Sequence, residues 1–312
     1  MIISASRRTD IPAFYWEWFQ KRLQEQYVLV RNPLNLHQVS RISLRPEVVD
    51  GLVFWTKNPE PMLKQLSVLD AYAYYFQFTL NAYAADVEAA LPPLAVRIEI
   101  FRQLAQKIGA ERMIWRYDPI LTNEEYDVSF HKEAFAQIAY GLKDHTEKCM
   151  LGFIDHYQHI RTAVGQFNIQ PLRKEEIEEI AVSFRNTINE YPAIQLDTCT
   201  SKVDLRHLGI PAGLCIDKEL IERITGYPLL AKKDKNQRNV CNCIESIDIG
   251  TYESCLNGCI YCYAIKGNYN SVEYNTKKHD RNSPLLIGHP AEDDVVKERE
   301  MKSLRNNQYS LF

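Results

Sequence analysis

The sequence predicts an α/β protein built as a complete or partial (β/α) barrel of the TIM type. Short apolar runs recur along the first two-thirds of the chain, and a longer segment with helical spacing of apolar residues follows each run. Six or seven such units imply parallel strands joined by crossover helices. The same alternation also produces a doubly wound open sheet, which is the alternative fold.

The elements follow from these patterns in chain order. Strands are expected at residues 1–4, 51–55, 73–79, 112–115, 149–154 and 194–196. Helices are expected at residues 13–24, 62–69, 93–109, 129–142, 174–190 and 217–225. Pro92 and Pro93 favour the start of the third helix, and Gly109 favours its end. The polar stretch around residues 32–41 fits a small hairpin.

Composition limits the class of protein. The 312 residues are 46% apolar and 25% charged, which suits one large barrel or two modest domains. The net charge of −3 excludes a global basic field for nucleic acid, so any such contact must be local. The polar start and the lack of a long apolar run predict neither a signal peptide nor a membrane span. We therefore expect a cytoplasmic protein in a reducing setting.

The character of the chain changes after residue 227. We expect a barrel over residues 1–230, a cysteine-rich loop that closes over the barrel mouth at residues 231–265, and a C-terminal extension at residues 266–312. A polar linker at residues 228–240 is the candidate boundary.

Three of the eight cysteines, Cys255, Cys259 and Cys262, are separated by three and then two intervening residues. This spacing can present three thiolates to one inorganic centre, and three ligands on a four-iron cube would leave one iron open for a small molecule. A structural zinc site is the main alternative, since zinc also accepts thiolates. Disulfides are disfavoured, because the cysteines are clustered and no secretion signal is present.

The motif resembles the signature of the radical S-adenosylmethionine (SAM) superfamily, in which an aromatic residue, here Tyr261, precedes the third cysteine. The sequence GCIYCYA is most similar to the spore photoproduct lyase branch. In that superfamily the loop usually follows the first barrel strand, whereas here it lies near the C-terminus. The resemblance implies a [4Fe–4S] cluster on the three cysteines, bound SAM, and Tyr261 near the adenine.

The resemblance extends more weakly over residues 1–160. The branch has strand ends that resemble Thr9-Asp10, Thr56-Lys57, Thr79-Leu80-Asn81 and Asp118-Pro119-Ile120, in that order. Only the cysteine loop is displaced, which a circular permutation would produce. The whole chain also looks similar to an uncharacterised bacterial family of unknown function.

Polar residues gather where the expected strands end. In a barrel the active site lies at the carboxyl ends of the strands. Charged residues at the ends of several consecutive strands therefore indicate a polar pocket at this rim. Each residue alone has a structural explanation, such as helix capping or an ion pair. The candidate catalytic residues are Arg7, Arg8, Asp10, Lys57, Arg116 and Asp118. The candidate cofactor-binding residues are Tyr261, Asn58, Asn81 and Asp155, and His156 is expected to be structural.

SAM carries a carboxylate and an amine. Guanidinium groups bind carboxylates in a bidentate manner, which makes Arg7, Arg8 and Arg116 candidates for the carboxylate. Asp10, Asp118, Asn58 and Asn81 are candidates for the amine or the ribose.

Four further cysteines could make a second closed site. Cys241 and Cys243 form a Cys-x-Cys pair, Cys199 follows an expected strand, and Cys215 precedes an expected helix. The set suits a second iron–sulfur cluster or a structural zinc, and the alternative is that Cys199 and Cys215 are small buried residues. Cys149 lies within a strand and is expected in the core.

Two surface features suggest partners. Residues 232–238 are basic, and basic residues are interspersed with tyrosines at residues 266–281. Such a surface could bind the phosphate backbone and stack on the bases of a nucleic acid. The alternative is that both stretches are solvated loops. The last residues, including Gln308, Ser310, Leu311 and Phe312, resemble the peptide that binds the bacterial sliding clamp, although Leu311 and Phe312 could instead pack on the protein itself.

Three functions are consistent with these patterns. The first is an iron–sulfur enzyme of radical SAM type, a lyase or transferase, that acts on nucleic acid in lesion repair or base modification. The second is a non-catalytic zinc or iron–sulfur module that the sliding clamp recruits to DNA. The third is a metal-independent barrel hydrolase that uses Asp10, Asp118 or Asp155 as acid and base.

Overall fold

The computed structural model describes residues 1–312 except 156, 200–202, 239–240, 267–268 and 308–312. His156 and the terminal peptide at Gln308, Ser310, Leu311 and Phe312 therefore lie outside the described residues. Every helix in the described ranges is too short or too polar to cross a membrane.

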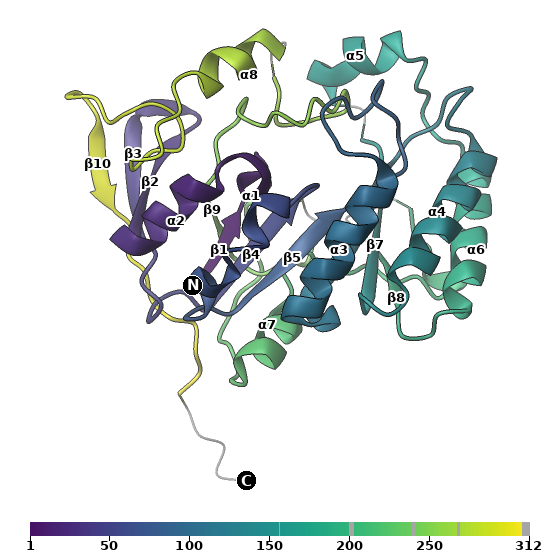
Figure 1. Ribbon diagram of the computed structural model, residues 1–312, viewed down its shortest axis with the longest axis horizontal. Helices are drawn as coiled ribbons and strands as arrows, with labels where there is room; N and C mark the ends of the chain where they lie inside the picture. The colour runs from purple at the N-terminus through teal and green to yellow at the C-terminus, as the bar shows by residue number, and fades with distance from the viewer. Residues whose placement is uncertain (156, 200–202, 239–240, 267–268, 308–312) are drawn as a thin grey trace.

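A seven-stranded sheet forms the centre of the protein (Figure 1), and all of its strands pair in parallel. Its order is β8-β7-β6-β5-β4-β1-β9. The strands are β1 (Ile2–Ala5), β4 (Gly51–Thr56), β5 (Tyr74–Thr79), β6 (Met113–Ile120), β7 (Lys148–Phe153), β8 (Gln195–Thr198) and β9 (Ile247–Asp248). The first six confirm the expected strands. Strand β9 comes late in the chain yet pairs with β1 at the edge of the sheet.

One face of the sheet is covered by helices. These are α2 (Trp16–Glu25), α3 (Leu94–Ile108), α4 (Val128–Leu142) and α6 (Lys174–Asn189), and Figure 1 shows α3, α4 and α6 against the sheet. Alternate strand residues such as Phe54, Phe76 and Trp115 meet the apolar faces of these helices, because successive side chains of a strand point to opposite faces. The ring of Phe135 stacks on that of Phe184 with 3.8 Å between centroids, which joins α4 to α6.

The other face is covered by α7 (Lys218–Thr225) and by the segments on either side of it. The complementary strand residues, among them Val53, Tyr75, Ile114 and Met150, pack there against Ile216, Leu220, Ile221 and Ile244. The protein is therefore an α/β fold whose sheet is flanked by helices. Among the described residues the hydrogen-bonded order ends at β8 on one edge and β9 on the other.

A second, three-stranded sheet lies beside the first. It holds the antiparallel pair β2 (Tyr27–Asn32) and β3 (Asn35–Ser43), with β10 (Val295–Glu298) parallel to β3. The polar stretch around residues 32–41 is indeed in a hairpin, but the hairpin begins earlier than its polarity suggests because Tyr27–Val30 is apolar.

Two expected helices differ from the structure. The first is broken at Tyr15 into α1 (Ile11–Phe14) and α2, because Asp10 caps a single turn that Tyr15 ends in a non-helical conformation. The second, at residues 62–69, is only the two 3₁₀ turns η1 (Glu60–Met62) and η2 (Leu66–Leu69). Lys64 and Gln65 separate their few apolar residues, which leaves too short a stripe for a stable α-helix.

The remaining elements were not expected. They are α5 (Arg161–Gln166), α8 (Tyr269–Thr276) and the short turns η3 (Ala110–Arg112), η4 (Gln158–Ile160) and η5 (Arg206–Leu208). Helices α5 and α8 lie at the top of the molecule in Figure 1, on either side of the chain that carries the cysteine loop.

Candidate metal centre and its surroundings

The segment at residues 249–265 runs over the carboxyl ends of the strands and carries Cys255, Cys259 and Cys262 (Figure 1). Asp248, at the end of β9, fixes the start of this segment. Its carboxylate accepts hydrogen bonds from Ser4 Oγ at 3.0 Å, Ser6 Oγ at 2.7 Å and the backbone N–H of Arg7 at 2.8 Å. These bonds attach the strand before the cysteine loop to the end of β1.

Asp10 attaches the loop itself to two further strand ends. This buried carboxylate accepts bonds from the backbone N–H of Lys57 at 2.8 Å and from Asn257 Nδ2 at 3.1 Å, and it caps α1 by accepting from the N–H of Ala13 at 3.0 Å. Burial raises the pKa of Asp10 despite these bonds. The expectation that Asp10 caps a helix is confirmed, and the same carboxylate positions the cysteine loop.

The three thiols of the loop are partly buried, and each lies within electrostatic range of the other two. Burial, together with these neighbouring sulfurs, raises the pKa of each thiol to about 12. A metal that binds here must therefore displace protons, as thiolate ligands require.

Beside the thiols lies a buried charge network. Lys57 Nζ is 2.7 Å from Glu88 Oε1 and 2.9 Å from Tyr261 Oη, and Tyr261 also donates to Glu88. Arg97 of α3 reaches the other carboxylate oxygen of Glu88 at 3.4 Å. The side chain of Glu88 has no exposure, and that of Lys57 has 13%.

This network sets a positive charge next to the loop. Burial alone would raise the pKa of Glu88, but the charges of Lys57 and Arg97 outweigh it and lower the pKa. Burial would likewise lower the pKa of Lys57, yet Glu88 and the nearby sulfur of Cys259 raise it. Glu88 is therefore ionised and Lys57 is a cation that faces Cys259.

The other candidate residues form a second group around Trp55. The guanidinium carbon of Arg7 lies 5.3 Å from the Trp55 ring centroid, and that of Arg116 lies 5.1 Å from it. Arg116 pairs with Asp118 and donates to Gln77 Oε1 at 3.2 Å and to Cys215 Sγ at 3.0 Å. In the described part of the chain Arg7 forms no ion pair.

The four remaining candidates have other partners, and Asn81 also donates to Glu88 Oε1 at 3.4 Å. Asn81 pairs with the backbone of Asp118, donating to its C=O and accepting from its N–H, both at 3.0 Å. Asn58 Oδ1 accepts from the N–H of Glu60 at 3.3 Å within the loop after β4. Asp155 pairs with Arg238. Arg8 lies over the ring of Tyr252, with Nε 3.9 Å from Asp248.

The four remaining clustered cysteines also come together. Cys199 Sγ is 3.1 Å from Cys215 Sγ, and Cys243 Sγ accepts from the N–H groups of Cys215 and Ile216 at 3.3 Å each. Cys149 lies apart from them in the apolar core of the other face, as expected. All eight cysteines are among the described residues, and none forms a disulfide.

Sequence reasoning missed Glu88, Arg97, Asp248 and Asn257. Glu88 and Asn257 are single polar residues in loops, and Arg97 lies on a helix whose pattern does not distinguish it from a surface arginine. Asp248 ends a strand of only two residues. The only signal for these residues is a polar side chain close to a strand end, and β9 is too short for its end to be recognised from the sequence.

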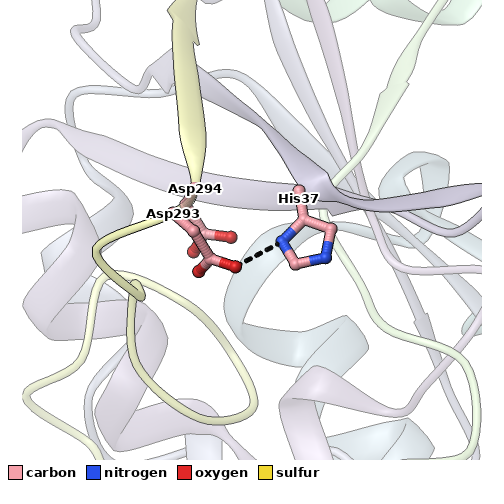
Figure 2. Close-up of side chains that lie close together, drawn as sticks. All are labelled: His37, Asp293 and Asp294. Carbon is pink, nitrogen blue, oxygen red and sulfur yellow. Dashed lines mark ion pairs between the residues drawn. The ribbon is translucent and has the colours of Figure 1, made fainter.

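One further group has the composition of a metal site. Figure 2 shows His37 of β3 beside Asp293 and Asp294, which lie just before β10, and the His37 ring is 3.0 Å from the Asp293 carboxylate. Within the described residues it is the one set of three His, Cys, Asp or Glu ligand atoms that all lie within 4.8 Å of one another. Arg31 already pairs with Asp294, so the charge of that carboxylate is compensated.

The spread of the loop sulfurs bears on the kind of metal. A single tetrahedral zinc with Zn–S bonds of about 2.3 Å places its sulfurs about 3.8 Å apart. The sulfurs of Cys255, Cys259 and Cys262, all of them described, do not form a set within 4.8 Å. Thiolates on three separate irons of a cube stand further apart than ligands of one ion, so the residues fit a cluster better than a single zinc.

Comparisons with known proteins give a family but no activity. No curated protein matches the chain, and no solved structure matches it. The sequence model of a family described as a domain of unknown function, DUF1848, matches residues 2–264. That span includes the seven-stranded sheet and all eight cysteines, and it ends two residues after Cys262. The chain therefore belongs to the DUF1848 family.

Proposed function

We propose that this protein is an iron–sulfur enzyme of radical SAM type in which Cys255, Cys259 and Cys262 hold a [4Fe–4S] cluster. The observation that carries the proposal is that these three partly buried thiols lie in one loop over the carboxyl ends of a parallel sheet. Polar side chains from β1, β4 and β5 surround the loop, which is where parallel α/β folds place their chemistry.

The strand order supports a circularly permuted partial barrel. Read from the strand that precedes the cysteine loop, the sheet runs β9, β1, β4, β5, β6, β7, β8. Every strand after β9 therefore follows in chain order, and only β9 with its loop has moved from the front to the back. This is the arrangement that the resemblance to the spore photoproduct lyase branch implies.

A cluster held by Cys255, Cys259 and Cys262 would supply the electron for reductive cleavage of SAM, and this cleavage would start hydrogen abstraction from the substrate. The chain's own residues would position the reactants. Lys57 offers a cation beside Cys259, and this cation offsets the negative charge of a thiolate-bound cluster. Glu88 and Asp10 hold Lys57 and the loop in place.

Among the rim arginines, Arg7 is the best candidate for the SAM carboxylate. Arg8 lies near Asp248, and Arg116 pairs with Asp118, so a carboxylate already compensates the positive charge of each arginine. Arg7 forms no ion pair with any described residue, and Trp55 supports its guanidinium. Tyr261 is bonded to Glu88 and Lys57, which fixes the ring next to Cys262.

The hydrolase alternative has less support. Asp10 is saturated by backbone and amide donors, Asp118 is paired with Arg116, and Asp155 is paired with Arg238.

The test is formation of 5′-deoxyadenosine. Anaerobically reconstituted protein with dithionite and SAM is expected to release 5′-deoxyadenosine. Arg7→Gln is expected to raise the SAM concentration needed for half-maximal release at least about tenfold, because it removes a charge-assisted contact to the SAM carboxylate. Arg41→Gln, which removes an exposed arginine of the hairpin, is the matched control and should leave release unchanged. Wild-type protein that holds a cluster but releases no 5′-deoxyadenosine would overturn the proposal.

We further propose single-stranded nucleic acid as the substrate class. Tyr263, Tyr269 and Tyr274 are 38–62% exposed beside the cysteine loop, and Lys266, Lys277 and Lys278 are exposed among them. Exposed aromatic rings among lysines suit base stacking along a phosphate backbone, despite the net charge of −3.

Fluorescence anisotropy with a labelled single-stranded oligonucleotide checks this substrate class. Tyr269→Ala with Tyr274→Ala is expected to weaken binding by about tenfold or more, since each stacked base contributes about 1–3 kcal/mol. Tyr140→Ala removes a 62% exposed tyrosine of α4 and is the control. Equal affinity of both variants and wild type would reject nucleic acid at this surface.

A further inference from the structure

We propose that Cys199, Cys215, Cys241 and Cys243 bind a second metal centre, closed by four protein thiolates and distinct from the loop site. It lies on the face of the sheet that α7 covers, whereas Cys255, Cys259 and Cys262 lie over the strand ends. The proposal does not depend on radical chemistry, because it rests on different cysteines and different contacts.

The four cysteines lie together on this face. Cys199 Sγ is 3.1 Å from Cys215 Sγ, and Cys243 Sγ accepts from the backbone N–H of Cys215 at 3.3 Å. Cys241 lies two residues before Cys243, and both pack in the same buried cluster as Cys215. Four neighbouring thiols are the donor set of structural zinc sites and of iron–sulfur clusters.

Positive groups converge on the sulfurs. Arg116 donates to Cys215 Sγ at 3.0 Å, and the backbone N–H groups of Cys215 and Ile216 donate to Cys243 Sγ at 3.3 Å. Four thiolates around a divalent centre leave a net negative charge, and N–H···S bonds and a guanidinium stabilise that charge. Cys149 lacks this environment, since it packs among apolar side chains of the opposite face.

The position of the site gives it a structural role. Cys199 directly follows edge strand β8, and Cys215 directly precedes the segment that leads into α7. Cys241 and Cys243 precede β9, the strand at the opposite edge. A metal on these four residues would therefore link the segment that follows edge strand β8 to the segment that precedes β9 at the opposite edge.

Neither a disulfide nor simple apolar packing explains the cluster. A disulfide requires a sulfur–sulfur distance of about 2.05 Å, well below the 3.1 Å between Cys199 and Cys215. Buried cysteines that act only as small apolar residues would not bring a guanidinium and two amides to their sulfurs.

The experiment is metal and sulfide analysis of full-length protein purified without oxygen. The variant with Cys255, Cys259 and Cys262 all replaced by alanine lacks the loop site, and it is expected to retain iron with sulfide, or one zinc, per chain. Adding Cys215→Ala and Cys243→Ala should remove that metal, whereas adding Cys149→Ala should not. A three-alanine variant with no more metal than the five-alanine variant would overturn the proposal.

A second measurement does not use the five-alanine variant, whose loss of metal could result from misfolding. The folded three-alanine variant, stripped of metal, is titrated with Co²⁺, and tetrathiolate coordination is expected to give strong sulfur-to-cobalt charge-transfer bands at one equivalent. No such bands would again reject the second centre. Because the loop site is absent from this protein, the result does not depend on whether the wild type cleaves SAM.

Discussion

Replacing Glu88 with alanine is expected to lower the free energy of unfolding by about 3–5 kcal/mol, because it leaves two buried cations without their shared counter-charge. Glu88 has no side-chain exposure and neutralises both Lys57 at 2.7 Å and Arg97 at 3.4 Å. The cost should appear as a lower urea midpoint with an unchanged slope of free energy against urea.

The matched control is Glu179→Ala. Glu179 pairs with Lys132 at 2.6 Å, but its side chain is 57% exposed, and exposed pairs contribute at most about 1 kcal/mol. Equal losses of stability in the two variants would show that the Glu88 network is not the buried ionic centre described above.

The same network predicts a dependence on pH. The folded pKa of Glu88 is lowered, so its charge contributes its full stability above its unfolded pKa of about 4.3 and loses that contribution as the pH falls through the folded value. The stability difference between wild type and Glu88→Gln should therefore be constant from neutral pH to about pH 5 and shrink on further acidification. A difference that grows in acid would contradict the sign of the shift.

The second large effect is expected from a single cysteine. Cys259→Ala should remove about four irons per chain from anaerobically reconstituted protein, because a cube held by only two of its three thiolates is not retained. Cys259 is also the thiol that faces the Lys57 cation. Iron and sulfide analysis together with the absorbance near 400 nm measures the loss.

Cys149→Ala is the control for this prediction. Cys149 is fully buried in strand β7, so its replacement tests the effect of removing a core thiol without touching either cysteine group. Its iron content should equal that of wild type. Retention of all iron in Cys259→Ala would mean that the loop does not hold the cluster.

The sequence was most informative where physical constraints are local. Apolar runs such as Gly51–Thr56 and Tyr74–Thr79 predicted the central strands because those strands are buried on both faces. Cysteine spacing predicted the loop, because three ligands of one centre must lie within a short stretch. The Cys199, Cys215, Cys241 and Cys243 grouping was also anticipated, and the contact of Cys199 with Cys215 agrees with it.

What the sequence could not give depends on contacts between distant residues. Glu88 is one acidic residue in a loop until the fold brings Lys57, Arg97 and Tyr261 to it. Strand β9 has two residues and no pattern of its own, and it is a strand because β1 offers it an edge. The open ends of the sheet at β8 and β9 likewise follow from pairing and not from any single segment.

The central claim is that Cys255, Cys259 and Cys262 hold a cluster with one iron open to SAM. Electron paramagnetic resonance of the dithionite-reduced wild-type protein, recorded with and without SAM, tests it most directly. We predict a reduced [4Fe–4S] signal that changes when SAM is added and that is absent from Cys259→Ala. A wild-type spectrum in which no reduced signal changes on addition of SAM, or a SAM-dependent signal that survives in Cys259→Ala, would contradict the claim.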